Sequence, residues 1–171
     1  MPEIANLPGP TTREFTPYVN GAPPSRILIG RVFLRKAYGP VKNDKQQTQY
    51  DYGRAFIEQV EYTELPYREI VVSWNTLSTV VTALRSKVSD EAAMDCIEEV
   101  TEKEIFDIEY PEDHIYEDTI SDFKDWNGDK PNMNELSDYL LMVSENIDFV
   151  LTWDNHFTIF PGITLLPHSY W

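Results

Sequence analysis

Short apolar runs alternate with amphipathic stretches between residues 26 and 166. Mainly apolar segments of four residues predict short buried strands, and they lie at residues 26–29, 70–73, 105–108, 149–152 and 163–166. Strands that alternate with helices pair in parallel through right-handed crossovers. The pattern therefore predicts an α/β fold, a three-layer α/β/α sandwich around a mainly parallel central sheet.

The helical pattern is clearest after the second predicted strand and before the fourth. Apolar residues recur at i, i+3, i+4 and i+7 in both stretches, as Leu77, Val80, Val81 and Leu84, then as Leu136, Tyr139, Leu140 and Val143. Further helices are predicted over residues 51–60 and 114–123, and after the N-cap residue Ser89. Asn146 can end the helix before the fourth strand in the left-handed conformation.

Two segments lack either pattern. Residues 1–25 are rich in proline and show no periodicity, so they are predicted to form an extended N-terminal arm outside the core. Residues 38–50 are polar and are interrupted by Gly39 and Pro40, which predicts a loop or insertion. Residues 26–171 then form a single domain, a size that can bury a substantial core.

Charge is distributed unevenly along the chain. Residues 90–171 hold 21 acids and 3 lysines, a net charge of −18, whereas residues 1–89 hold 8 acids and 11 Lys or Arg, a net charge of +3. The one local basic cluster consists of Arg26, Arg31, Arg35, Lys36, Lys42 and Lys45. So acidic a chain repels nucleic acid unless a basic face or bound cations intervene, and it favours a basic partner segment. A solvated acidic face that only confers solubility is the simpler interpretation.

Other features narrow the class of protein. No apolar run is long enough to span a bilayer, and the first 20 residues lack the apolar core of a signal peptide, so we expect a soluble, cytoplasmic protein with no membrane association. Cys96 is the only cysteine and is interpreted as a buried thiol. His114, His156 and His168 form no zinc motif and are interpreted as surface or capping histidines.

Three segments resemble PIN-domain proteins, the small Mg²⁺-dependent ribonucleases that include the VapC-type toxins. IDFVLTWDNHF, followed by PGITLLP, resembles the closing strand, acidic turn and last strand of that family. VVSWNTLSTVVTALRSK resembles the second strand with its helix, and RILIGRVFLRKAYG resembles the opening strand. The similarity runs, with gaps, from about residue 26 to residue 166.

The resemblance implies four acidic positions that hold Mg²⁺, a hard cation that prefers oxygen ligands. Two of them fall on Asp138 and Asp154, the implied catalytic and metal-binding residues. The other two fall on Gly30 and Thr79, neither of which can replace a carboxylate. The acidic site is therefore expected to be degenerate, with Mg²⁺ or Mn²⁺ held weakly or not at all.

Nearby residues offer two ways to compensate. Asp118, or its neighbours Asp122 and Asp125, could lend a further metal ligand. Arg31 adjoins the first vacant position, where a guanidinium could pair with Asp138 or Asp154 and replace the metal. The remaining acids near these positions are interpreted as surface acids or caps; they are Asp113, Asp129, Glu135 and Asp148.

The favoured function is that of a catalytically degenerate relative of VapC-type toxins that acts through binding or assembly. Its partner would be a protein, either antitoxin-like or an assembly subunit, or a second copy in a homodimer. The alternative is a Mg²⁺- or Mn²⁺-dependent single-strand endoribonuclease with an altered metal site, and only this alternative requires RNA. A purely structural interaction module that uses the proline-rich arm and the loop at residues 38–50 is a third interpretation.

Overall fold

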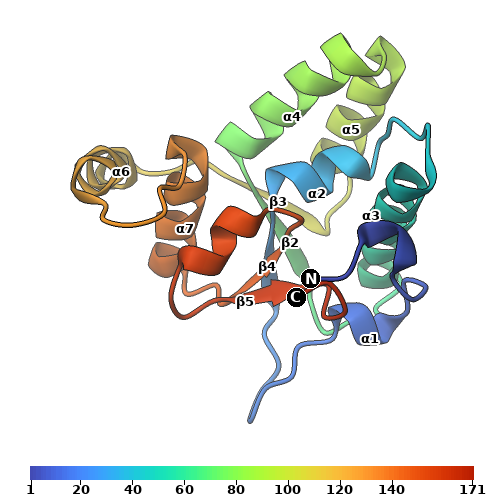
Figure 1. Cartoon of the computed structure of the whole chain (residues 1–171), viewed down its shortest axis with the longest axis horizontal. Coiled ribbons are helices and arrows are strands. Elements are labelled where there is room, and N and C mark those ends of the chain that lie inside the picture. The colour runs from blue at the N-terminus through green and yellow to red at the C-terminus, as the bar shows by residue number, and fades with distance from the viewer.

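Five parallel strands form the centre of the molecule. The computed structural model describes residues 1–171 and arranges the strands in the order β3-β2-β1-β4-β5 (Figure 1). Their bounds are β1 (Arg26–Ile29), β2 (Glu69–Ser73), β3 (Phe106–Glu109), β4 (Phe149–Leu151) and β5 (Thr164–Leu166). Every neighbouring pair is parallel. The predicted sheet is confirmed, and all five predicted strands are present with their ends within one residue.

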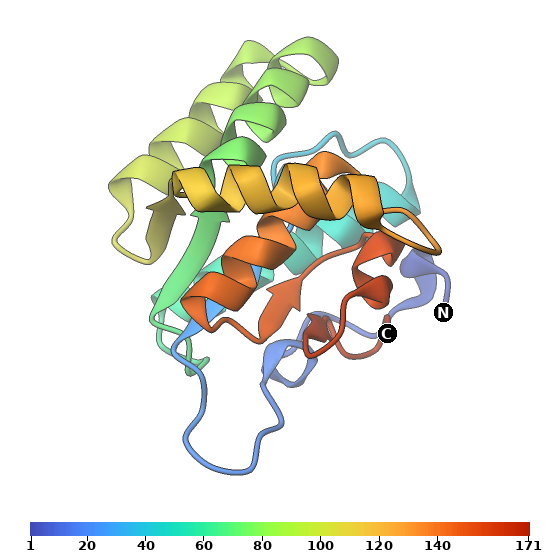
Figure 2. The ribbon, with the colours of Figure 1, turned by 90° about the vertical axis from the view of Figure 1, so that its left-hand side faces the viewer.

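Helices cover both faces of the sheet. They are α1 (Thr12–Phe15), α2 (Arg31–Lys36), α3 (Asp44–Glu61), α4 (Trp74–Lys87), α5 (Asp90–Glu102), α6 (Asp113–Asp125) and α7 (Met133–Glu145), with two 3₁₀ turns, η1 (Ile4–Asn6) and η2 (Asn155–Ile159). In Figure 1, α6 and α7 lie on one side of the sheet and α1 and α3 on the other. Figure 2 shows α6 crossing outside α7. The predicted three-layer α/β/α sandwich is confirmed.

The inner strands β1, β2 and β4 are apolar on both faces because each face has its own core. Ile27 and Ile70 belong to the larger core, which the residues of α2 to α5 complete. Leu28, Val71 and Val150 belong to the smaller core beneath α7. Strands buried on both faces read as continuous apolar runs, which is why the sequence revealed them.

The N-terminal segment is part of the fold, contrary to the prediction of an extended arm outside the core. Phe15 is fully buried and packs edge-on against Tyr52 and Phe56, with ring centroids 5.9 and 5.2 Å away. The Tyr67 hydroxyl donates to the Phe15 carbonyl at 2.8 Å, and the Tyr52 hydroxyl donates to the Pro8 carbonyl. The prolines set the path of this segment without excluding it from the core.

The predicted loop is shorter than expected. Helix α3 begins at Asp44, so only residues 38–43 of the predicted loop are non-helical. The first of them, Tyr38, belongs to the turn that follows α2. The Asn43 side chain accepts a hydrogen bond from the Gln46 amide at 2.9 Å, which caps the helix. The polar residues at the start of α3 form a solvated helical face, and their lack of an apolar stripe hid the helix from a periodicity argument.

None of the helices is both long enough and apolar enough to cross a membrane.

Substitution of Phe15 tests the role of the N-terminal segment. Phe15→Ala should lower the free energy of unfolding by about 3 kcal/mol or more, because it removes a fully buried ring and leaves a cavity. Urea denaturation would measure the change. Val19→Ala, at an exposed position in the same segment, should change stability by less than about 0.5 kcal/mol. A similarly small loss for Phe15→Ala would mean that the segment does not contribute to the core.

Candidate functional site

Several polar side chains meet where the parallel strands end. Strands β1, β2 and β4 all finish at the same edge of the sheet and lead into Gly30, Trp74 and Thr152. Helix α7 begins at this carboxyl end of the strands and carries the chain back to their amino end, where β4 starts. In open α/β sheets, ligands bind outside the carboxyl ends of the strands.

Asp138 is held inside the protein by two hydroxyl groups. Its side chain is 3% exposed, and its two carboxylate oxygens accept hydrogen bonds from Ser73 Oγ at 2.6 Å and Thr76 Oγ1 at 3.0 Å. Burial raises the pKa of Asp138 to about 6, although the two hydrogen bonds favour the charged form and limit the rise. Each oxygen therefore already has a partner within the protein.

A second acid of α7 lies beside Asp154. Glu135 is buried, and its side chain accepts a hydrogen bond from the Asn132 amide at 2.9 Å in a capping box at the start of the helix. The predicted capping role of Glu135 is confirmed, but the residue is not a simple surface acid. One ligand atom each from Glu135, Asp154 and His156 lie within 4.8 Å of one another, a group that could hold a metal ion.

These three residues, Glu135, Asp154 and His156, are called the acidic centre below. His156 Nδ1 lies 3.0 Å from a carboxylate oxygen of Glu135 and 3.7 Å from one of Asp154. The hydrogen bond with Glu135 and the nearby negative charges raise the pKa of His156. Burial, together with the neighbouring Asp154, raises the pKa of Glu135. An imidazolium at this position neutralises part of the charge that the two acids place close together.

The acidic centre brings together one predicted site residue and two that the sequence did not reveal as such. Asp154 follows β4 as expected, and its side chain caps η2 by accepting from the His156 amide at 3.0 Å. Asp138 lies three residues after Glu135 on α7 and is not among the three residues that could hold a metal ion. Asp118 is exposed on α6 and is not among them either.

Gly30 and Thr79, the two positions at which the resemblance implies an acid, have different surroundings. A Cβ atom on Gly30 would lie 3.1 Å from Thr152 Oγ1 and 3.2 Å from the Leu151 carbonyl oxygen, so the end of β4 leaves little room for a side chain there. The Gly30 amide also donates to that carbonyl at 2.8 Å. Thr79 is half-buried on α4 and lines a pocket that it shares with Arg31.

Arg31 takes part in none of the ion pairs of the structure. Its charge still acts on Asp138, because it opposes the rise in the pKa of that buried carboxyl group. The basic side chain in contact with the acids is instead His156, and its raised pKa favours the charged form. The sequence pointed to an internal cation, and the structure places a histidine, not the arginine, against Glu135 and Asp154.

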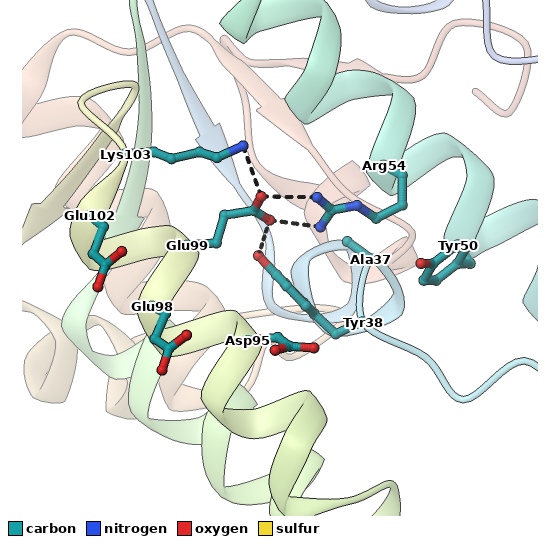
Figure 3. A pocket seen from close by; sticks show the side chains of 9 residues that line it. All are labelled: Ala37, Tyr38, Tyr50, Arg54, Asp95, Glu98, Glu99, Glu102 and Lys103. Carbon is teal, nitrogen blue, oxygen red and sulfur yellow. Dashed lines mark hydrogen bonds and ion pairs between the residues drawn. The ribbon is translucent and has the colours of Figure 1, made fainter.

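A separate pocket of about 470 Å³ lies between α3, α5 and the end of α2 (Figure 3). Glu99 accepts hydrogen bonds there from Arg54 at 2.7 and 2.9 Å and from the Tyr38 hydroxyl at 2.7 Å, and it pairs with Lys103 at 3.0 Å. Burial alone would raise the pKa of Glu99, but these partners outweigh it and lower the pKa to about 2. Since Glu99 and its partners satisfy one another, we interpret this group as a bridge between helices.

The fold can now be compared with known proteins. No protein-family model and no curated protein sequence matches the chain. Among solved structures, it is similar to VapC20 of Mycobacterium tuberculosis, a toxin that cleaves the sarcin-ricin loop, with a TM-score of 0.64. The alignment covers 80% of this chain and 96% of the toxin. The fold is PIN-like. Because the two sequences are only 11% identical, the similarity to this toxin concerns the fold alone.

The raised pKa of Asp138 predicts a specific pH dependence of stability. Its pKa in the folded protein, about 6, exceeds the ordinary value of 3.8, so the folded state binds more protons between these values. This group should therefore contribute less stability as the pH rises from 4 through 6. Asp138→Asn should lack this decline. Its stability relative to that of the wild type should therefore rise as the pH increases from 4 to 6.

Urea denaturation at several pH values between 4 and 7 would measure the effect. Asp118→Asn is the matched control, since it makes the same chemical change at an exposed position. Parallel pH profiles for the wild type and Asp138→Asn would show that burial of Asp138 does not perturb its titration.

Proposed function

We propose that this PIN-like protein is catalytically degenerate and acts by binding a protein partner. The observation that carries the proposal is the contact of His156 with Glu135 at 3.0 Å and Asp154 at 3.7 Å. In a metal-dependent nuclease, close carboxylates are neutralised by bound Mg²⁺ or Mn²⁺. Here His156 contacts both acids, and its raised pKa favours the imidazolium, which would take over the electrostatic role of the metal.

The ligands that remain support at most one weakly held ion. Glu135 and Asp154 offer hard oxygen atoms, and His156 could add a nitrogen, a donor set better suited to Mn²⁺ than to Mg²⁺. An ion bound there would polarise a phosphate and activate water. A two-metal site is disfavoured, because Gly30 and Thr79 supply no bridging carboxylate. Asp138 is already committed to Ser73 and Thr76.

The surface that best suits a protein partner lies on α6. Tyr116, Ile120 and Phe123 follow one face of this helix at i, i+4 and i+7, and all three are at least 41% exposed. The helix carries five acids and one lysine. An apolar stripe with acidic flanks favours a basic amphipathic segment, such as one supplied by an antitoxin-like protein or an assembly subunit. A second copy of the chain would bring an equally acidic helix and is less suitable.

A metal-dependent single-strand endoribonuclease is the second candidate. It is favoured by the three ligand atoms of the acidic centre, which lie within 4.8 Å of one another. In this case Asp154 and Glu135 would hold the metal and His156 would be a ligand. The two candidates therefore assign opposite effects to the imidazole.

Removal of the imidazole separates the two functions. If His156 replaces a metal, His156→Ala should bind Mn²⁺ more tightly than the wild type, because the variant leaves Glu135 and Asp154 without their cation. If His156 is a ligand, the same variant should bind more weakly. Isothermal titration calorimetry with Mn²⁺ and Mg²⁺ would measure both proteins.

A cleavage assay completes this test. Single-stranded RNA should remain intact when the wild type is supplied with Mg²⁺ or Mn²⁺. The Glu135→Gln, Asp154→Asn double variant serves as the blank, and Asp118→Asn, Asp122→Asn is the matched surface control. Metal-dependent cleavage by the wild type that the double variant loses, and the surface control retains, would replace the binding proposal with the nuclease.

A further inference from the structure

A second pocket lies between α2 and α4 and has a volume of about 290 Å³. One wall consists of Arg31 and Arg35, which are four residues apart and so share a face of α2. The other wall consists of Thr79, Ala83 and Lys87, which follow one face of α4 at four-residue intervals. The small side chains at positions 79 and 83 leave space between the two helices.

The pocket is cationic in a strongly acidic protein. The chain contains 29 acids, yet none of them lines this pocket. Of its 14 Lys and Arg residues, four form ion pairs, and these are Arg26, Arg54, Arg85 and Lys103. Arg31, Arg35 and Lys87 form none, so three positive charges converge on the pocket without an internal anion to balance them.

The neighbouring charges strengthen the positive field. Lys36 follows Arg35 on α2 without lining the pocket, and burial, together with repulsion from Arg35 and Lys45, lowers its pKa. Repulsion among neighbouring cations raises the free energy of the folded protein, and a bound anion would relieve it. This arrangement favours a ligand that carries several negative oxygen atoms.

The donors suit a tetrahedral phosphate. Guanidinium groups form paired hydrogen bonds with phosphate oxygens, and a lysine adds a compact charge. The Thr79 hydroxyl can donate a further hydrogen bond. Val32 and Val80 supply the apolar part of the lining, which holds the arginine stems in place. Thr79 thus has a use at a position where a PIN nuclease would be expected to have an acid.

We propose that the pocket formed by Arg31, Arg35, Thr79 and Lys87 binds a phosphate group. The phosphate could belong to the backbone of a single-stranded nucleic acid or to a small phosphorylated molecule, since both present the same oxygen atoms. Arg31 places the pocket beside the carboxyl edge of the sheet, within electrostatic reach of Asp138. The inference does not depend on the proposed function, because no metal and no residue of the acidic centre takes part.

Fluorescence anisotropy with a labelled oligouridylate, in the presence of EDTA, would test the site without any contribution from metal. Binding to the wild type should weaken about tenfold in Arg31→Gln, Arg35→Gln. Binding should also weaken in Lys87→Gln. Because Lys87 is exposed, its substitution should not disturb the fold, so a loss of binding would report on the site itself. The slope of log affinity against log salt should decrease by about 0.7 for each phosphate that a variant no longer neutralises. Lys124→Gln, Lys130→Gln is the charge-matched control and should bind as the wild type does.

The source of the phosphate follows from a second measurement with uridine monophosphate and inorganic phosphate, each titrated by calorimetry. If the oligouridylate does not bind but either small molecule does, with the same dependence on Arg31, Arg35 and Lys87, the site is supported and its ligand is small. Absence of binding by all three probes would overturn the proposal. So would equal losses in the control variant, or equally tight binding of an oligoglutamate.

Discussion

The hydrogen bonds from Ser73 and Thr76 to the buried Asp138 carboxylate fix the arrangement of the whole carboxyl edge. Ser73 ends β2 and caps α4, and its hydroxyl both accepts from the Thr76 amide and donates to Asp138 on α7. A buried carboxylate is costly unless its oxygens are satisfied, so the position of α7 in which both hydroxyls reach Asp138 is strongly favoured. Glu135 is three residues earlier on the same helix, and its location beside Asp154 follows from this constraint.

The other end of α7 is held by Arg26 at the opposite edge of the sheet. Glu145, the last residue of α7, lies 3.1 Å from the guanidinium, which also contacts Glu69, Asp107 and Glu109 from β2 and β3. One cation thus gathers four acids from three elements of a chain that has twice as many acids as bases. These contacts stabilise the start of the central strand and leave α7 little freedom to tilt.

The sequence predicted the elements well where burial determined the residue pattern. The strands, α4 and α6 were located to within a residue or two, and the caps Ser89 and Asn146 are confirmed. Helix α3 begins seven residues before the helix predicted at residues 51–60, and α2 was not predicted. The N-terminal segment escaped because Phe15 is a single buried ring among prolines. Such a contact depends on tertiary packing, which no local pattern records.

The candidate site was harder to predict, since its members come together only through the fold. Asp154 was accessible from the sequence because it follows a recognisable strand. Glu135 and His156 are 21 residues apart and meet across the sheet edge. One signal was available, namely the spacing of Asn132 and Glu135, which is that of a capping box and places the glutamate in the first turn of α7. The partnership of Glu135 with a histidine had no local signal at all.

The contact between the two ends of the chain has a consequence for the order of folding. Glu14 accepts hydrogen bonds from the Ser169 amide at 2.9 Å and the Ser169 hydroxyl at 2.6 Å, so the contact spans 155 residues. Closing so large a loop costs conformational entropy, and this cost is reduced once the intervening sheet has brought the two ends together. The two ends therefore join after the sheet, whereas Phe15 can pack earlier, because its ring partners Tyr52 and Phe56 follow it closely in the chain.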